Sequence, residues 1–521
     1  MNTLFVWPEI PVTYWGAQYS MRLIGKRAVM PPLSLLTVAA LCPREWNMRL
    51  VDLNIEQLDQ ADLEWADLVL ISGMAIQHRS MVETLSRCKQ AGVATVVGGP
   101  HATSSPERLA DATHLLLDEG EITLPLFLHD LAAGNPQRVY NANGHKPDVT
   151  QTPIPRFDLL KLDAYANMCI QFSRGCPFAC EFCDITTLYG KNPRTKTPKQ
   201  VLSELETLYD LGFRGEVFLV DDNFIGNKKN VKLMLPELIT WQQEHQYPFW
   251  FYTEASMNLA DDDELLGLMG KANFHSVFMG IESPSLESLR ETHKYQNLHG
   301  DMLSKVHKIH RHGIEVMAGF IVGFDSDAED IFERQIQFIT AARIPMAMIG
   351  PLNAMPNTQL WVRLQDEGRL RTDFQGDTFG FCNFVTKLPA LTLVRGYRTV
   401  LATLYSPTNF FARLYDLFDS LDCSRNKTLG RLSLSTQLRW FVPLIKALVW
   451  LGLMDRNRGE YWRFMLWVWR NHRDKFLFAL CRTITGYHFI QYTSEVMVPR
   501  LTLLEAELQE QEKQCLAKIA G

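Results

Sequence analysis

The sequence predicts an α/β protein in three parts: an open Rossmann-like sheet, a full or partial barrel of alternating strands and helices, and a helical C-terminal segment. The first third alternates short β-rich runs with helical runs, and the middle third repeats this alternation after a linker. From about Phe379 the strand alternation is lost. Regular alternation of strands and helices is typical of parallel sheets. The 521 residues leave room for about three domains.

Composition predicts where the parts meet. The stretch from Gly134 to Pro155 is rich in Gly, Asn and Pro, which suits a connection between domains. We therefore expect a Rossmann-like domain over residues 1–140, a linker over 141–164, a barrel over 165–375 and a helical domain over 376–521.

The first domain is expected to contain five strands, at residues 3–7, 48–53, 68–72, 94–98 and 114–117, with helices such as 34–41 and 80–91 between them. Ligands of such sheets bind at the carboxyl ends of the strands, where glycine lets the backbone come close. Any one of these glycines is equally compatible with an ordinary turn. The candidate binding residues at these strand ends are Ser72, Gly73, Met74, Gly98, Gly99, Glu119, Gly120 and Glu121.

The second domain is expected to contain six strands, at residues 169–173, 216–221, 249–254, 276–282, 315–322 and 347–352. In a barrel of this kind the chemistry lies at the carboxyl ends of the strands, and polar residues gather there. An acid after a strand can also cap the next helix, as Asp222 or Asp325 could. The candidate ligand-binding residues are Asp221, Asp222, Asn223, Glu254, Ser256, Glu282, Gly319 and Gly323.

Three cysteines follow the first barrel strand at CxxxCxxC spacing: Cys176, Cys180 and Cys183. Three thiolates on one short loop suit a cubane iron–sulfur cluster, because each binds one iron and the fourth iron stays open to a substrate. The alternative is a structural zinc site, but such a site needs four ligands and the sequence has no second CxxC or HxxxH pair. The spacing therefore favours a catalytic iron–sulfur cluster over a structural metal site.

Charge and cysteine usage exclude several classes of protein. The net charge of −6 argues against a nucleic-acid binder, and ten scattered cysteines are too few for a disulfide scaffold. The first residues carry no basic region ahead of an apolar stretch, so we expect a cytoplasmic protein.

The cysteine loop, with Phe182 before its last cysteine, resembles the signature of the radical S-adenosylmethionine superfamily. Five further runs, residues 217–230, 251–260, 277–285, 316–327 and 354–370, resemble the cobalamin-type radical enzymes that include the hopanoid C-2 methylase. The anaerobic magnesium-protoporphyrin monomethyl ester cyclase is a more distant relative. This resemblance implies a six-strand partial barrel and a [4Fe-4S] cluster whose open iron binds S-adenosylmethionine. It assigns Asp221 and Asp222 to the amino group of that ligand, and Glu254 and Glu282 to its ribose or nearby polar atoms.

The serine after one strand and the Gly-Gly after the next also resemble two elements of the cobalamin-binding domain. The first element of that domain, DxHxxG, is replaced here by Pro8-Glu9-Ile10-Pro11. Cobalamin-type radical enzymes often lack its histidine and hold the cofactor with no protein ligand to cobalt. His78 and His101 are candidate neighbours of the cobalt, and we assign no axial ligand.

The resemblance implies a cobalamin-dependent methyltransferase. One S-adenosylmethionine would methylate cobalamin and a second would supply a deoxyadenosyl radical that takes hydrogen from an unactivated carbon. An electron donor such as flavodoxin or ferredoxin is implied as a partner. Two alternatives stay open: a cyclase or oxidase that delivers no methyl group, and a non-catalytic cobalamin sensor with a structural cluster.

Residues 430–500 carry eleven Lys or Arg against four acids, together with five of the twelve tryptophans. This mixture predicts either an interfacial helix on a membrane surface or a helical cap whose aromatic rings pack on the barrel. The longest apolar run, residues 440–454, is too short to span a bilayer. The composition favours a hydrophobic small-molecule substrate, such as a hopanoid or other polycyclic lipid, and peripheral contact with the inner membrane face.

Overall fold

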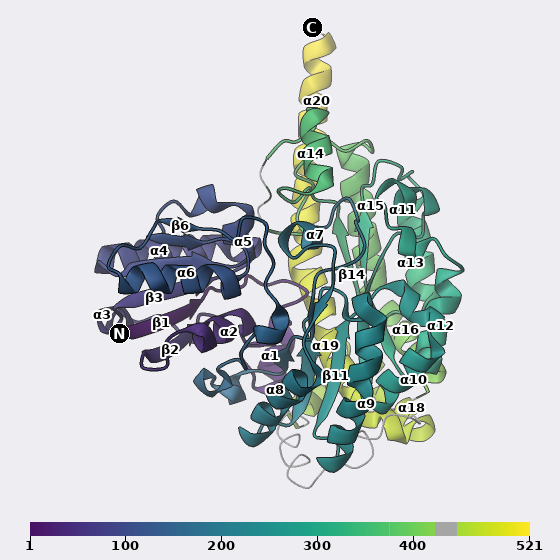
Figure 1. Ribbon diagram of the computed structural model, residues 1–521. Helices are drawn as coiled ribbons and strands as arrows, with labels where there is room; N and C mark the ends of the chain where they lie inside the picture. The colour runs from purple at the N-terminus through teal and green to yellow at the C-terminus, as the bar shows by residue number, and fades with distance from the viewer. Residues whose placement is uncertain (373, 375, 423–444, 521) are drawn as a thin grey trace.

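The computed structural model describes residues 1–372, 374, 376–422 and 445–520, the last six by backbone alone (Figure 1). Two lobes lie side by side: an N-terminal lobe built on one sheet, and a larger lobe built on a second, curved sheet (Figure 1). The C-terminal helices pass between the lobes, and the last one projects beyond them (Figure 1). The predicted α/β class and its three parts are confirmed.

The N-terminal sheet has six parallel strands in the order β2-β1-β3-β4-β5-β6. Five were expected from the sequence. The sixth, at the sheet edge, has only two residues, of which one is exposed and one buried, so it has no pattern that a sequence could reveal. The strands are β1 (Asn2–Trp7), β2 (Asn47–Asp52), β3 (Leu68–Ser72), β4 (Ala94–Gly98), β5 (His114–Leu116) and β6 (Val139–Tyr140).

Helices cover both faces of this sheet because its central strands are apolar on both sides. Strand β3 is buried at all five positions. Helices α2 (Leu33–Leu41) and α6 (Gly120–Ala132) pack on one face, where Leu35 and Phe127 meet Phe5. The other face is covered by α3 (Gln60–Trp65), α4 (His78–Ala91) and α5 (Pro100–Ser104). A short helix, α1 (Gln18–Ile24), leaves this lobe and packs on the C-terminal helices.

The segment between the lobes contains three single turns of 3-10 helix: η3 (Val149–Gln151), η4 (Phe157–Leu159) and η5 (Leu162–Ala164). It is anchored on the N-terminal lobe, because the Tyr165 hydroxyl donates to Asp52 Oδ2 at 2.9 Å and Tyr165 bridges to Ala28.

The second sheet has six parallel strands in the order β14-β13-β12-β11-β10-β7, and β7 and β14 form its two edges. A curved sheet with two edges is a partial barrel, as the family resemblance implied. The strands are β7 (Met168–Ile170), β10 (Gly215–Leu219), β11 (Phe249–Glu254), β12 (Phe274–Glu282), β13 (Glu315–Val322) and β14 (Ala347–Pro351).

The first barrel strand is shorter than expected. It was predicted to extend to Ser173 but ends at Ile170, because Asp221 accepts hydrogen bonds from Phe172 N at 2.8 Å and Ser173 Oγ at 2.9 Å. The chain then forms a separate antiparallel pair, β8 (Ser173–Arg174) with β9 (Arg194–Thr195).

Amphipathic helices cover the outside of the barrel, where alternate strand residues such as Val316, Ala318 and Phe320 are buried. They are α8 (Pro198–Asp210), α9 (Lys228–Glu244), α10 (Asp263–Lys271), α11 (Leu286–Glu291), α12 (Met302–Arg311) and α13 (Ile331–Ala341). Two further helices lie elsewhere: α7 (Ile185–Leu188) follows the cysteine loop and contacts α5, and α14 (Gln359–Asp366) contacts the cysteine loop.

The C-terminal third is helical, as predicted. Helices α15 (Ala390–Leu404) and α16 (Pro407–Ser420) precede the undescribed residues 423–444. After them come a helix at 445–449, the π-helical turn η10 (Trp450–Met454), α18 (Arg458–Asn471), α19 (Phe476–Tyr492), a second π-helical turn, η12 (Thr493–Met497), and α20 (Val498–Ala520). Within the described ranges, none of the helices is long and apolar enough to cross a membrane.

Replacing Gly486 by alanine tests the packing of α19 on α16. An added Cβ would lie 2.2 Å from Cζ of Phe410, whose side chain is 1% exposed and has no room to move. We expect Gly486→Ala to lower the free energy of unfolding by about 1–3 kcal/mol, the usual cost of overpacking. Gly267→Ala in α10 is the matched control. Nothing lies within 4 Å of its added Cβ, so it should gain up to about 1 kcal/mol of helix propensity. Equal denaturation curves for the two variants would contradict this packing.

Candidate functional site

The cysteine loop lies at the carboxyl end of the barrel, directly after β8. Gly175, just before Cys176, has φ +92°, and a Cβ there would meet the carbonyl oxygen of Gly190 at 2.9 Å. Only glycine fits this close, left-handed turn without strain.

Groups far away in the sequence hold the loop in place. Glu181 lies between two of the cysteines and forms two hydrogen bonds with Arg363 of α14, at 2.5 and 3.1 Å. Its backbone N–H donates to the carbonyl of Thr292, and its carbonyl accepts from Leu360 N, both at 3.0 Å. The sequence analysis missed Glu181 and Arg363, and their separation of 182 residues leaves no local signal.

The thiols lie among nitrogen donors. Asn223 Nδ2 is 3.8 Å from Cys176 Sγ, and Gln296 Nε2 is 3.5 Å from Cys180 Sγ. Burial raises the pKa of the Cys176 and Cys183 thiols above their usual range, while the ammonium of Lys294 acts in the opposite direction on both. No three His, Cys, Asp or Glu side chains in the described part of the chain lie close enough to hold a single metal ion.

Asp221 and Asp222, at the end of β10, are tied to the backbone that leads into the loop. Asp221 receives the two bonds from Phe172 and Ser173 given above, and Asp222 Oδ2 accepts from Gly175 N at 2.7 Å. Burial raises the pKa of Asp221 to about 7 and that of Asp222 to about 6. Neither is a helix cap; both hold residues 172–175 in place. Asp325, the other candidate cap, forms ion pairs with Arg363 and Arg369 instead.

Glu254, at the end of β11, is the third acid at the barrel mouth, beside Asp221 and Asp222. Burial, together with the charges of Asp222 and Asp221, raises the pKa of Glu254 to about 8, and Lys294 opposes the shift. Asn223 and Ser256 lie beside each other, with Asn223 Nδ2 donating to Ser256 Oγ at 3.1 Å.

Glu282, at the end of β12, is paired with Lys294 at 2.7 Å. A bulge between Gly280 and Glu282 redirects its side chain, and its φ of +66° is a left-handed value. Burial alone would lower the pKa of Lys294, but Glu282 and the cysteine thiols raise it above its ordinary range. The sequence analysis missed Lys294, because it lies in a segment without a recognisable motif.

The remaining predicted residues of the barrel mouth surround this cluster. A Cβ on Gly319 would lie 3.2 Å from Phe278 and 3.9 Å from Glu282 Oε2, so glycine leaves room for that carboxylate. Gly323 adopts φ +96° and donates its N–H to Asp327 Oδ2 at 2.8 Å, which makes it part of a turn. The Phe182 ring packs 6.2 Å from that of Phe324, with Lys294 Nζ 5.9 Å from its centre.

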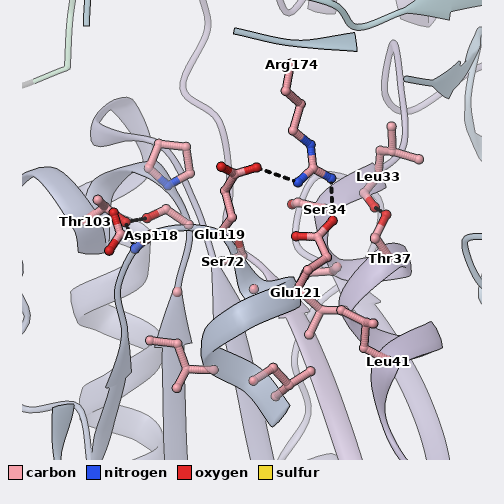
Figure 2. A pocket seen from close by; sticks show the side chains of 18 of the residues that line it. Leu33, Ser34, Thr37, Leu41, Ser72, Thr103, Asp118, Glu119, Glu121 and Arg174 are labelled. Atoms are coloured by element: carbon pink, nitrogen blue, oxygen red, sulfur yellow. Dashed lines mark hydrogen bonds and ion pairs between the residues drawn. The ribbon is translucent and has the colours of Figure 1, made fainter. Parts of the chain in front are cut away.

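A cavity of about 220 Å³ opens at the carboxyl end of the N-terminal sheet (Figure 2). Its inner part is apolar and lies between the sheet and helices α2 and α6, where Leu41, Leu70 and Leu124 line it. Its mouth is polar and reaches the barrel at Arg174. Six of the eight candidate residues of this lobe line the cavity: Ser72, Gly98, Gly99, Glu119, Gly120 and Glu121.

Arg174 joins the two lobes at the mouth of this cavity (Figure 2). Its guanidinium donates to Glu119 at 2.9 Å and to Glu121 at 2.7 Å, and Glu119 also binds Arg194 at 2.8 Å. Burial alone would raise the pKa of Glu121, but Arg174 lowers it overall. The two glutamates were predicted as ligand-binding residues. In the structure their carboxylates bind arginines of the barrel.

Gly73 and Met74 do not line the cavity, and Met74 is 42% exposed. His78 and His101 do not line it either. They bind each other, with His78 Nδ1 2.9 Å from His101 Nε2. Burial lowers the pKa of His101 to about 4, and His78 and Arg108 contribute to this shift.

A larger cavity, of about 660 Å³, occupies the inside of the barrel. Its walls are mainly aromatic and methionine side chains of the strands, including Phe218, Tyr252, Phe278 and Met317, and α19 closes its open side. Glu254 lines this cavity, and Lys294, which acts on its charge, also acts on the thiols of the cysteine loop.

Known domains match three segments of the chain: a B12 binding domain over residues 26–128, the radical SAM superfamily over 170–339, and a domain of unknown function over 358–499. The hopanoid C-2 methylase of Rhodopseudomonas palustris is 34% identical, over 94% of this chain and 93% of that one. The chain belongs to the cobalamin-binding radical S-adenosylmethionine enzymes that include this methylase.

An uncharacterised methyltransferase of Synechocystis sp. is more similar still, at 44% identity over 94% of this chain and 92% of the relative. The fold is also that of OxsB, a cobalamin-dependent S-adenosylmethionine radical enzyme. The match to its structure includes 100% of this chain and 81% of the OxsB chain, with a TM-score of 0.59 and 14% sequence identity.

Membership of this family of radical enzymes makes the chain a cobalamin-dependent radical S-adenosylmethionine methyltransferase. Its cofactors are a [4Fe-4S] cluster, S-adenosylmethionine and cobalamin. The residues present fit them. Three free thiols on one loop suit the cluster, and Gly98 and Gly99 bring backbone to the mouth of a cavity whose inner part is apolar.

Replacing Arg174 by methionine tests the junction between the lobes of this radical enzyme. The change removes a guanidinium that is 13% exposed and leaves Glu121 buried without its cation. Breaking a buried ion pair from one side costs about 3–5 kcal/mol. We expect a loss of stability of this size in denaturant unfolding of Arg174→Met.

The control for that variant is Arg79→Met, which removes an arginine 92% exposed from its pair with Glu83. An exposed pair of this kind contributes at most about 0.5 kcal/mol. Similar losses in the two variants would show that Arg174 does not hold the lobes together.

Proposed function

We propose that this enzyme methylates an unactivated carbon of a hydrophobic substrate of the polycyclic lipid class, such as a hopanoid. The observation that carries the proposal is the apolar cavity of about 660 Å³ inside the barrel, which reaches Glu254 beside the cysteine loop. A cavity of this size suits a small-molecule ligand, and its aromatic and methionine walls suit an apolar one. The similarity to the hopanoid C-2 methylase supports the same class.

In this proposal Cys176, Cys180 and Cys183 hold the cluster. Glu254, Asn223, Ser256, Glu282 and Lys294 supply the polar groups around S-adenosylmethionine, and Asp221 and Asp222 act through the loop that they hold. When bound, the cluster supplies the electron that cleaves S-adenosylmethionine, and cobalamin carries the methyl group to be transferred. A reduced flavodoxin or ferredoxin is the proposed electron donor.

The loops of Ser72, Gly98 and Gly99 and the cavity behind them are the proposed cobalamin site. A cavity of about 220 Å³ is far smaller than cobalamin, so it would take a projecting apolar part of the cofactor, such as the benzimidazole of the nucleotide tail. Because Arg174 binds Glu119 and Glu121, the carboxyl ends of both sheets face one another. Substrate held between them is shielded from water, which would otherwise quench a radical.

We also propose that the C-terminal helices contact the membrane surface from one side. Between residues 445 and 469, eight large apolar side chains are at least 40% exposed; we call them the apolar helical surface: Ile445, Leu448, Val449, Trp450, Leu453, Met454, Leu466 and Trp469. Arginines 456, 458, 463, 470 and 473 lie among them, a combination that suits anionic headgroups. Trp462 and Trp467 instead pack against the core, as the alternative prediction of a helical cap requires, and Trp440 lies outside the described residues.

Flotation with liposomes tests this contact. The wild-type protein should float with phosphatidylglycerol vesicles and much less with phosphatidylcholine vesicles. The triple variant Leu453→Ser/Met454→Ser/Trp469→Ser should lose most of this binding, because it removes three side chains that are 64, 61 and 52% exposed. Leu233→Ser/Leu503→Ser, at 59 and 67% exposure on α9 and α20, is the control and should float like the wild type. Wild-type protein that remains wholly unbound would refute the contact.

Anaerobic assay of the reconstituted enzyme tests the proposed reaction. With cluster, cobalamin, dithionite and a hopanoid substrate, the wild type should form both 5′-deoxyadenosine and S-adenosylhomocysteine, and the product should gain the mass of a methyl group. Cys180→Ala should form no 5′-deoxyadenosine, because one iron of the cluster loses its ligand. Cys88→Ala, which removes a buried free thiol of α4, should keep both products.

The outcomes separate the alternatives. Deoxyadenosine without S-adenosylhomocysteine, together with an unmethylated product, would favour a cyclase or oxidase. Unchanged deoxyadenosine formation in Cys180→Ala would overturn the role of the cysteine loop.

A further inference from the structure

The cavity inside the barrel is apolar along its length and polar at one end. The polar end lies at the amino ends of the strands, opposite the cysteine loop. There Arg482 of α19 enters the barrel and donates to Glu315 Oε2 at 2.6 Å and to Ser276 Oγ at 2.9 Å. Glu216, at the start of β10, lines the cavity beside them. We call Glu216, His275 and Arg482 the floor of the cavity; Glu315, which Arg482 binds, does not itself line the cavity.

The floor holds more polar groups than the protein itself satisfies. Oε1 of Glu315 and Nδ1 of His275 are buried without a hydrogen-bond partner in the described residues, and these side chains are 0% and 6% exposed. The guanidinium of Arg482 binds Glu315 directly and acts on Glu216 through its charge. Burial raises the pKa of both Glu216 and Glu315, and Arg482 opposes the shift in each. Unsatisfied buried polar groups cost stability unless something else binds them.

Methionine and aromatic side chains separate the floor from the cysteine loop. In strand register Glu216 lies opposite Trp250, and Glu254 follows Trp250 by four residues on the same face of β11. At about 3.3 Å per residue, the floor lies about 13 Å from Glu254. The cavity is therefore long enough for several fused rings placed end to end.

We propose that this cavity binds its substrate lengthwise, with a hydroxyl-bearing end on the floor and the apolar skeleton along the barrel, so that the opposite end meets Glu254 and the cysteine loop. The proposal rests on the proposed function and adds the orientation of the substrate. It also gives a role to Arg482, which touches no residue of the cysteine loop. The ligand class is a rigid hydrocarbon with a polar group at one end.

One wall of the cavity belongs to a helix that also carries part of the apolar helical surface. Lys446 lines the cavity, and its Nζ would lie 3.2 Å from a Cβ on Gly25 of the opposite wall. Lys446 belongs to the same helix as the exposed Ile445, Leu448 and Val449. A lipid that leaves the membrane at this surface would therefore enter the barrel from the end that carries the floor.

Direct binding to the cobalamin-loaded protein tests the proposal without methyl transfer. The probes are hopane, a saturated pentacyclic hydrocarbon, and its analogue with a hydroxylated side chain, both supplied in cyclodextrin and measured by equilibrium dialysis. The wild type should bind the hydroxylated probe about tenfold more tightly than hopane, as expected for a hydrogen bond with a charged group. Glu216→Leu should remove this preference, and Glu216→Gln should keep part of it.

Met348→Trp narrows the cavity and should weaken the binding of both probes about tenfold or more. Leu233→Trp, on the exposed face of α9, is its control and should bind like the wild type. Circular dichroism and the absorbance of bound cobalamin confirm that each variant is folded. Equal binding of both probes by the wild type, or unchanged binding in Met348→Trp, would overturn the inference.

Failure of this inference and failure of the proposed function are distinguishable. The enzyme could transfer a methyl group to a hopanoid while Glu216→Leu and Met348→Trp leave probe binding unchanged. That result would support the proposed function and refute the proposed orientation of the substrate. Probe binding as predicted without any methyl transfer would support the binding site and refute the proposed reaction.

Discussion

The ion pairs of Arg174 with Glu119 and Glu121 are the interaction on which the arrangement of the molecule depends. Each sheet brings its loops to the carboxyl ends of its own strands, and neither sheet alone determines what those loops will face. Arg174 lies one residue beyond Ser173, which Asp221 holds, and two residues before Cys176. The same short segment therefore positions the cysteine loop and binds the end of β5, so that the two ligand-binding edges are brought together.

The cost of this arrangement is a concentration of buried acids. Asp221, Asp222 and Glu254 lie close enough to raise one another's pKa, and Lys294 is the cation among them. Asp221 and Asp222 accept hydrogen bonds from backbone N–H groups, and both acids help to raise the pKa of Glu254. Buried acids this close together destabilise the folded state, so the rest of the fold must offset that cost. They also favour the binding of a ligand with positive charge or hydrogen-bond donors.

Helix α19 has a comparable role at the other end of the barrel. A six-stranded partial barrel leaves its inner face open between β7 and β14, and a radical formed there would meet water. The aromatic side chains of α19 and of the segment around Tyr14 close this side, and Tyr14 donates to or accepts from Thr493 at 2.6 Å. Arg482 is carried into the barrel on the same helix, so the closure of the cavity and the charge on its floor come from one element.

The sequence by itself determined the strands, the order of the three parts and the cysteine loop. These depend on patterns within a few residues, such as the period of apolar side chains and the spacing of Cys176, Cys180 and Cys183. Ser72, Gly98 and Gly99, which the sequence predicts to bind a ligand, line a cavity in the structure. The sequence did not reveal β6, which is too short to carry a pattern. It also did not reveal that β7 ends early, because the cause is a pair of hydrogen bonds to Asp221 at the end of the neighbouring strand β10. Only the tertiary structure showed that Glu119 and Glu121 bind arginines, that Lys294 lies beside the thiols and that Arg482 enters the barrel. The physical reason is that each of these contacts joins side chains of separate elements, so the partner is decided by which faces the sheets and helices bring together.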